Sequence, residues 1–178
     1  MTRLTGIMPT LLLSVMLFGH SSDVNADSGR WLESKSPMDA SQAVQNPPVQ
    51  SGGRATAYIR IDRGFRRAAV RVNYSNLVGE FTRIHLHCAP AGANGPIALG
   101  FVDLVALPFD NTESVTLGSK TIVGSLNNDQ FPADSANQCG IFTLRDLADA
   151  IDAGEIYWNL HTTAFPPGEL RGQVLPLE

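Results

Sequence analysis

The C-terminal stretch Glu155–Val174 has the most regular pattern of apolar and polar positions in the chain. Trp158 and Leu160 alternate with polar neighbours, and a second alternating run, which contains Leu170 and Val174, follows a Phe-Pro-Pro-Gly segment. Alternation with a period of two is typical of β-strands with one buried face, and Pro and Gly are typical of turns. The stretch therefore predicts a β-hairpin.

The facing pattern also predicts a register, because cross-strand partners share one face of a sheet. A loop over Ala164–Gly168 places His161 opposite Arg171 and Asn159 opposite Gln173. These polar side chains then form one outward patch. In an antiparallel sheet such a patch is either an ordinary solvated face or a functional site.

Five upstream segments show the same kind of alternation or a continuous apolar run, and each predicts a strand. They are Arg54–Arg63, Arg66–Tyr74, Phe81–His87, Ile97–Leu107 and Thr121–Leu126. The polar stretches Asp110–Ser119 and Asn127–Gln138 predict loops.

One segment has a helical period instead. Thr143 is a helix-capping residue type, and Gly154 ends the pattern. The apolar residues between them recur at i, i+3, i+4 and i+7, and they are Leu144, Leu147, Ala148 and Ile151. One short helix among seven or eight strands predicts an all-β fold, an antiparallel β-sandwich or barrel with the helix before the C-terminal hairpin.

Two motifs resemble the chordin-type, or CHRD, domain. The first is His-Leu-His-Cys followed by a Gly- and Pro-rich loop, over His85–Ile97. The second is the helix, its Ala-Gly end and the closing Tyr-Trp-Asn-Leu-His-Thr…Gly-Glu-Leu-Arg-Gly-Gln hairpin, over Asp146–Val174. The resemblance covers roughly Arg54–Pro176. It implies an extracellular binding module, since animal chordin is an extracellular antagonist that binds growth factors and bacterial members are mostly secreted domains of unknown role.

The N-terminal region predicts export. Residues 1–26 combine Arg3, the apolar run Ile7–Phe18 and small residues up to Ala26, which is the pattern of a signal peptide cleaved before Asp27. The apolar run is short for a membrane span. Residues 27–53 show no period and predict a flexible arm, with Trp31 and Leu32 as its apolar anchor, so we place the CHRD domain at residues 54–178.

Composition and cysteines narrow the function classes. The chain has 178 residues, 43% of them hydrophobic, which suits one domain with one core, and its net charge of −4 argues against a nucleic-acid partner. Cys88 and Cys139 lie outside any Cys-x-x-Cys motif. In an exported protein they predict a disulfide; the alternative is two buried thiols.

The chemistry-bearing residues are histidines. Apart from His20 in the signal region, the chain contains His85, His87 and His161. The first two point to one side of a strand, and imidazoles on rigid strands are ligands for Cu or Zn. The alternatives are histidines that hydrogen-bond the loop carbonyls around Ala89–Asn94, or proton-transfer catalysts. A His-x-His strand in a secreted, disulfide-bonded β-barrel is also similar to copper/zinc superoxide dismutase, without a fourth histidine or the zinc-site loop.

No catalytic motif for a nucleophile, a phosphate or a dinucleotide is present. The sequence therefore predicts an exported, non-enzymatic module that binds a protein or surface ligand, with a Cu- or Zn-binding or dismutase-like protein as the alternative. Arg171, Glu169 and Asn159 form the candidate surface patch, in which Arg171 and Glu169 alternatively make a cross-strand ion pair.

Overall fold

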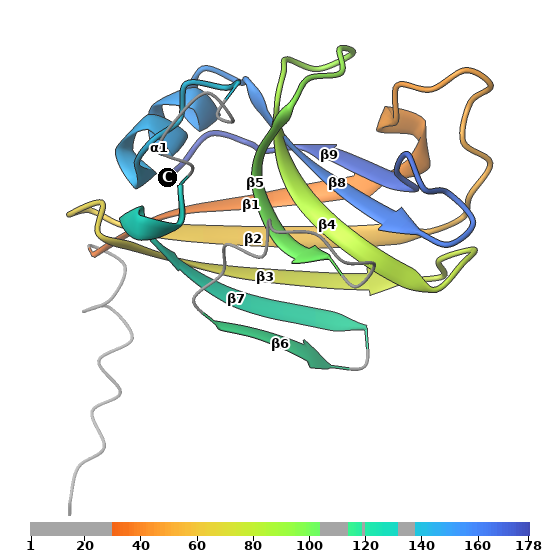
Figure 1. The fold of residues 1–178 in the computed structure, drawn as a ribbon, viewed down its shortest axis with the longest axis horizontal. Helices are drawn as coiled ribbons and strands as arrows, with labels where there is room; N and C mark the ends of the chain where they lie inside the picture. The colour runs from red at the N-terminus through yellow and green to blue at the C-terminus, as the bar shows by residue number, and fades with distance from the viewer. Residues whose placement is uncertain (1–29, 104–113, 119, 132–137) are drawn as a thin grey trace, which may run out of the picture.

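The computed structural model describes residues 30–103, 114–118, 120–131 and 138–178, with the side chains of all of these except residues 102–103 and 114–118. Within this part, nine strands form one antiparallel sheet in the order β5-β4-β8-β9-β1-β2-β3-β7-β6. The sheet curls into a nearly closed barrel, and β4 and β5 cross over β2 and β3 (Figure 1). The predicted all-β fold is confirmed.

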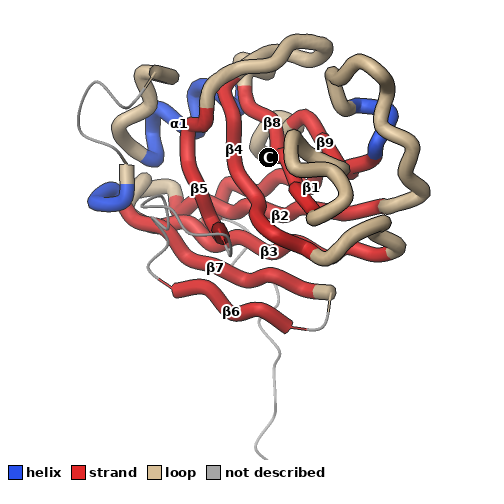
Figure 2. The backbone as a smooth tube through the Cα atoms, turned by 45° about the vertical axis from the view of Figure 1, so that its right-hand side comes forward, coloured by secondary structure: helices blue, strands red, loops and turns tan. Residues whose placement is uncertain are grey.

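The elements are β1 (Trp31–Asp39), η1 (Ala40–Gln42), β2 (Arg54–Asp62), β3 (Arg67–Ser75), β4 (Phe81–Cys88), β5 (Ile97–Asp103), β6 (Ser114–Gly118), β7 (Thr121–Asn127), η2 (Asn128–Gln130), α1 (Leu144–Asp152), β8 (Ile156–Thr162) and β9 (Leu170–Gln173). The strands wrap around a common interior, and α1 lies at one end of the barrel (Figure 2).

Alternate side chains of the strands fill the barrel interior. In β2 and β3, Ala57, Ile61 and Val72 are fully buried, whereas their sequence neighbours face outward. Trp158 of β8 is also fully buried and its ring lies 5.1 Å from that of Phe101. The period of two seen in the sequence thus marks the boundary between core and outer surface.

Helix α1 begins and ends where the sequence predicts. The Thr143 hydroxyl accepts a hydrogen bond from the Asp146 N–H at 3.1 Å. Gly154 has a φ of +74°, a left-handed conformation that favours glycine. The apolar face of the helix is buried, as its spacing requires, through Leu144, Leu147, Ala148 and Ile151.

The interpretation of residues 27–53 as a flexible arm is wrong for the part that the structure describes. β1 pairs with β2 along its whole length and with β9 at Asp39, so it lies inside the sheet. Its sequence hides this because the inward positions Ser34 and Ser36 are polar, yet only 6% and 0% exposed. Pro37 is tolerated because β9 pairs with β1 only at Asp39, so no partner needs its missing N–H. The domain therefore starts at β1 and not at residue 54.

The polar stretch Asp110–Ser119 also contains a strand, β6, which pairs with β7. The prediction of a loop over this stretch is therefore wrong. β6 lies at the edge of the sheet, where a strand tolerates polar residues. Residues 104–107, the end of the predicted strand Ile97–Leu107, lie outside the described part. No helix among the described residues is long and apolar enough to cross a membrane.

Candidate metal centre

The three histidines meet on the outer side of two neighbouring strands. β4 pairs with β8 so that Arg83 lies opposite His161 and His85 opposite Asn159. His85 and His87 alternate with core residues of β4 and therefore share a face with His161. Their potential ligand atoms all lie within 4.8 Å of one another. The sequence analysis predicted this convergence for the case that the two strands are neighbours, and β4 and β8 are neighbours in the sheet.

The face that carries the histidines is covered, which corrects the expected outward patch. His85 is 3% exposed and His161 is 5% exposed, while His87 is half-buried. The loop after β4 and the connection between β8 and β9 fold over them. The side chains thus face away from the barrel core and are still shielded from water.

Two backbone carbonyls fix the orientation of two rings. The Nδ1 of His87 donates to the Gly95 carbonyl at 2.9 Å, and the Nδ1 of His161 donates to the Pro166 carbonyl at 2.8 Å. A carbonyl oxygen only accepts, so both Nδ1 atoms carry the proton. In each neutral ring the lone pair is then on Nε2. The predicted alternative of histidines that hydrogen-bond loop carbonyls is thus present in the structure, though the acceptors are Gly95 and Pro166.

The surroundings of His85 and His87 keep these two imidazoles neutral. Burial, followed by the neighbouring His161, His87 and Arg83, lowers the pKa of His85 from 6.5 to about 3. Burial also lowers the pKa of His87; the hydrogen bond to Gly95 partly offsets this, and Arg171 lowers it further. Neutral imidazole is the form that binds metal ions.

Arg171 shapes the covering loop rather than a surface. It is 3% exposed, and its guanidinium donates to the carbonyls of Ala93 at 2.7 Å and Pro90 at 3.1 Å. It lies 3.6 Å from the centroid of the Tyr157 ring, which in turn stacks on His87 at 5.0 Å. Arg171 therefore holds the loop in place above the histidines, and the prediction that it forms part of a surface patch is wrong.

The register of the hairpin differs from the predicted one by two residues. Arg171 lies opposite Asn159, and Tyr157 lies opposite Gln173. The shift is even, so every side chain keeps its predicted face. The Asn159 amide donates to the Pro167 carbonyl at 3.2 Å, which ties the strand to a connection longer than the expected turn.

Glu169 is fully buried and does not contact Arg171, so the predicted ion pair is also wrong. Its carboxylate accepts hydrogen bonds from the Ser51 hydroxyl at 2.6 Å, the Val78 N–H at 2.9 Å and the Thr162 hydroxyl at 2.7 Å. Glu169 therefore joins three segments that are far apart in the sequence.

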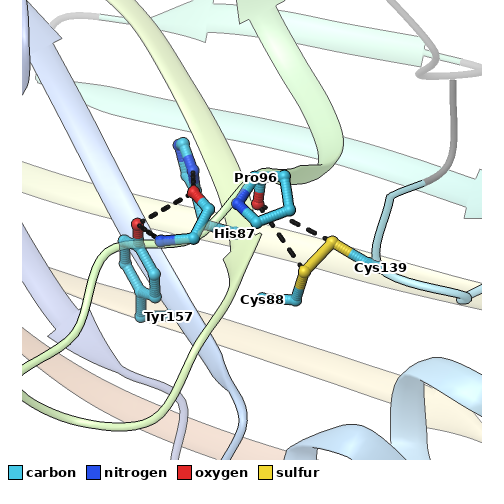
Figure 3. Close-up of a disulfide and its surroundings, with 6 residues drawn as sticks. His87, Cys88, Pro96, Cys139 and Tyr157 are labelled. Carbon is cyan, nitrogen blue, oxygen red and sulfur yellow. Dashed lines mark hydrogen bonds between the residues drawn. A yellow bond between two sulfur atoms is a disulfide. The ribbon is translucent and has the colours of Figure 1, made fainter.

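The predicted disulfide between Cys88 and Cys139 is present and ties the end of β4 to the segment before α1. Figure 3 shows it beside Pro96, whose carbonyl lies 3.8 Å from the Cys88 sulfur and 3.7 Å from the Cys139 sulfur. The Cys88 N–H donates to the same carbonyl at 3.0 Å. The bond anchors the strand that carries His85 and His87.

Sequence reasoning missed two features of the surface. A pocket of about 170 Å³ opens beside His87 and is lined by Tyr157, Arg171 and Asn94, among others. A larger groove of about 890 Å³ runs over the outer face of β1, β2 and β3, with Trp31 and Tyr58 in its lining. The alternation in β2 correctly predicted that its polar residues face outward. The groove was missed because residues 27–53 were interpreted as a flexible arm, and the groove also needs β1.

Comparison with known proteins gives one match. The family model described as CHRD domain matches residues 34–174. No curated protein and no solved structure matches the chain. The matched segment begins within β1 and ends directly after β9, so it contains the three histidines and most of the groove lining, whereas Trp31 and Leu175 lie outside it.

Proposed function

This chain belongs to the CHRD domain family, and from this premise we propose that it is an exported, non-enzymatic module that binds an acidic protein surface. The observation that carries the proposal is the groove on the outer face of β1, β2 and β3, where Tyr58 and arginine side chains lie around the buried Trp31 on a rigid sheet. Tyr, Trp and Arg are the residue types most enriched at the centres of protein interfaces.

The aromatic side chains of the groove are held in place by cations. The Trp31 ring lies 4.8 Å from the guanidinium of Arg60 and 5.2 Å from that of Arg67. The Lys35 ammonium lies 5.8 Å from the Tyr58 ring. Such stacking orders the long side chains before binding, which lowers the entropy cost of forming an interface.

The charge of the groove indicates an acidic partner. Lys35, Arg60 and Arg71 line it and are exposed, and the exposed carboxylates in its lining are Glu33 and Glu178. The lining thus has three exposed basic side chains and two exposed acidic ones, in a chain whose net charge is −4. A local field of this sign attracts and orients an acidic surface. Apolar contact area at the margin comes from exposed side chains, Val123 and Leu175.

Poly-L-glutamate is a suitable probe for this surface in isothermal titration calorimetry. We expect salt-sensitive binding that weakens about tenfold or more in the Arg60→Glu/Arg71→Glu variant, because like charges across an interface are unfavourable. The matched control is Arg54→Glu/Lys120→Glu, which changes the charge equally at exposed positions outside the groove lining. It should retain most of the affinity. An equal loss in both variants, or no binding by the unaltered chain, would contradict the proposal.

A redox function similar to superoxide dismutase has less support. The chain has four histidines, of which three form the cluster and the fourth is His20 in the predicted signal region. The cluster thus has no fourth imidazole to bridge a second metal ion.

A further inference from the structure

We propose that His85, His87 and His161 together bind one Zn(II) or Cu(II) ion on the covered face of β4 and β8. This site lies apart from the groove and does not depend on the proposed binding function. Its first support is position: the ring centroids of His85 and His161 are 5.0 Å apart, and those of His87 and His161 are 6.4 Å apart. Three donors from two hydrogen-bonded strands form a rigid ligand set.

The second support is a pair of buried ring nitrogens. Among the residues that the structure describes, the Nδ1 of His85 and the Nε2 of His87 have no hydrogen-bond partner, and His85 as a whole is 3% exposed. Buried polar atoms in folded proteins nearly always have a partner, because losing water without replacement destabilises the fold. A metal ion among the three rings supplies that partner.

The third support is the arrangement around the ligands. Metal-binding histidines commonly donate their second ring N–H to a carbonyl, which fixes the tautomer and aims the other nitrogen at the ion. His87 does this with Gly95, and His161 does it with Pro166. The Pro166 carbonyl also accepts from the Arg83 guanidinium at 3.1 Å, so its own position is fixed.

The donor chemistry selects the metal. Three neutral imidazoles suit Zn(II) and Cu(II), whereas Ca(II) and Mg(II) prefer oxygen ligands. With metal–nitrogen bonds of about 2.0–2.1 Å, tetrahedral ligands lie about 3.4 Å apart, so donor atoms within 4.8 Å of one another need only small ring rotations to reach them. Three protein ligands leave a fourth position open.

The charges near the site determine which ligand the metal ion prefers at its fourth coordination position. Arg83 donates to the same Pro166 carbonyl as His161, and Arg171 lies over the Tyr157 ring that stacks on His87. Among the side chains that the structure describes, the cluster contains no carboxylate. The ion therefore keeps its full positive charge beside two guanidinium groups, which favours an anionic fourth ligand such as hydroxide over a neutral one. The pocket beside His87 provides the path to it.

The test uses the full, untagged chain after removal of metal with a chelator, titrated with Zn(II) or Cu(II) alone. We expect one equivalent to bind and the melting temperature to rise. His87→Ala and His161→Ala should each weaken binding about a hundredfold or more, since even residues that only orient a ligand cost 10–100-fold. Asp149→Ala, which removes a carboxylate exposed on α1 and outside the cluster, is the control and should bind like the unaltered chain.

Electron paramagnetic resonance of the Cu(II) form keeps the test independent of whether a variant folds. Three coordinated imidazoles in the unaltered chain support the site. A folded chain that binds no ion overturns it, as does binding that both His87→Ala and His161→Ala retain. Neither result bears on poly-L-glutamate binding, because the charge variants of the groove leave all three histidines intact.

Discussion

At the scale of single residues, the covered faces of the sheet depend on polar side chains that bond to backbone groups. Arg171, His87 and His161 donate to loop carbonyls, whereas Glu169 accepts from an N–H and two hydroxyls. A loop that folds over a sheet brings unpaired backbone groups with it, and these must find partners. The outward residues of β4, β8 and β9 supply the partners and thereby define the covering loops.

Replacing Glu169 by Ala should lower the free energy of unfolding by about 2–4 kcal/mol, because three donors lose the fully buried carboxylate that accepts from them. Denaturant unfolding monitored by circular dichroism measures it. The control is Glu155→Ala, since Glu155 is exposed at the start of the same hairpin, and it should change stability by about 0.5 kcal/mol or less. Equal small effects would show that Glu169 does not join the segments.

Asp62 at the end of β2 stabilises the turn into β3 in a pH-dependent way. Its carboxylate accepts from the backbone N–H groups of Arg66 at 2.6 Å and Arg67 at 2.9 Å. Burial by itself raises the pKa of Asp62, but these hydrogen bonds and the two arginine charges outweigh it, so the pKa lies below 3.8. The unfolded chain then takes up the proton more readily. The stabilisation is therefore present above pH 3.8 and is lost as the pH falls through the folded-state pKa.

We expect Asp62→Ala to cost about 1–3 kcal/mol of unfolding free energy at pH 7, and the difference from the unaltered chain to shrink as the pH falls below 3.8. Urea unfolding at a series of pH values measures both. Asp149→Ala, at an exposed position of α1, serves as the control. A difference that persists unchanged in acid would exclude the carboxylate as its cause.

At the scale of elements, the hairpin of β8 and β9 is positioned by what lies against it. A Cβ on Gly172 would collide with the Pro37 carbonyl and with Met38, so β9 approaches β1 closely at that point. On the other side, β8 pairs with β4 along seven residues of the strand. The hairpin therefore lies between β4, which carries His85 and His87, and β1, which forms one side of the groove.

The disulfide anchors this arrangement at the end of β4. It closes a loop whose ends are 51 residues apart, so its removal in Cys88→Ser/Cys139→Ser should lower stability by about 3–4 kcal/mol through the greater freedom of the unfolded chain. Denaturant unfolding with and without reductant measures the change. Thiol labelling of the denatured, unreduced chain should find no free cysteine. Two labelled cysteines would contradict the bond.

At the scale of the whole molecule, the barrel has two outer regions of different character. One is covered by loops and carries the three histidines, and the other is the open groove over β1, β2 and β3. The three histidines and most of the groove lining lie within the segment matched by the family model. A disulfide-bonded domain of this family fits an oxidising environment outside the cytoplasm.

Export remains a prediction, since residues 1–29 lie outside the described part. We expect cleavage after Ala26, because a charged start, a short apolar run and a small residue at the cut define a signal peptide. N-terminal sequencing of the protein from the culture medium should begin at Asp27. Ala26→Arg should retain residues 1–26. A mature chain that still carries Leu11–Phe18 would contradict the prediction.

The sequence by itself determined those strands and helix ends that depend on residues close together in the chain. Alternation marked β2, β3, β4 and β8, and Thr143 and Gly154 marked the helix, because strand faces and helix caps depend on residues a few positions apart. The shared face of His85, His87 and His161 followed from the same period once the strands were taken as neighbours.

Only the tertiary structure decided the rest. Ser34 and Ser36 gave β1 no apolar pattern, and the strand exists because β2 and β9 pair with its backbone, which carries no sequence signal. The hairpin register was set by the contacts of Asn159 with the connection and of Gly172 with β1. The burial of His85 and Arg171 came from loops far away in the chain. Long-range packing decides solvent exposure, and solvent exposure decides whether a polar face is an open surface or a buried site.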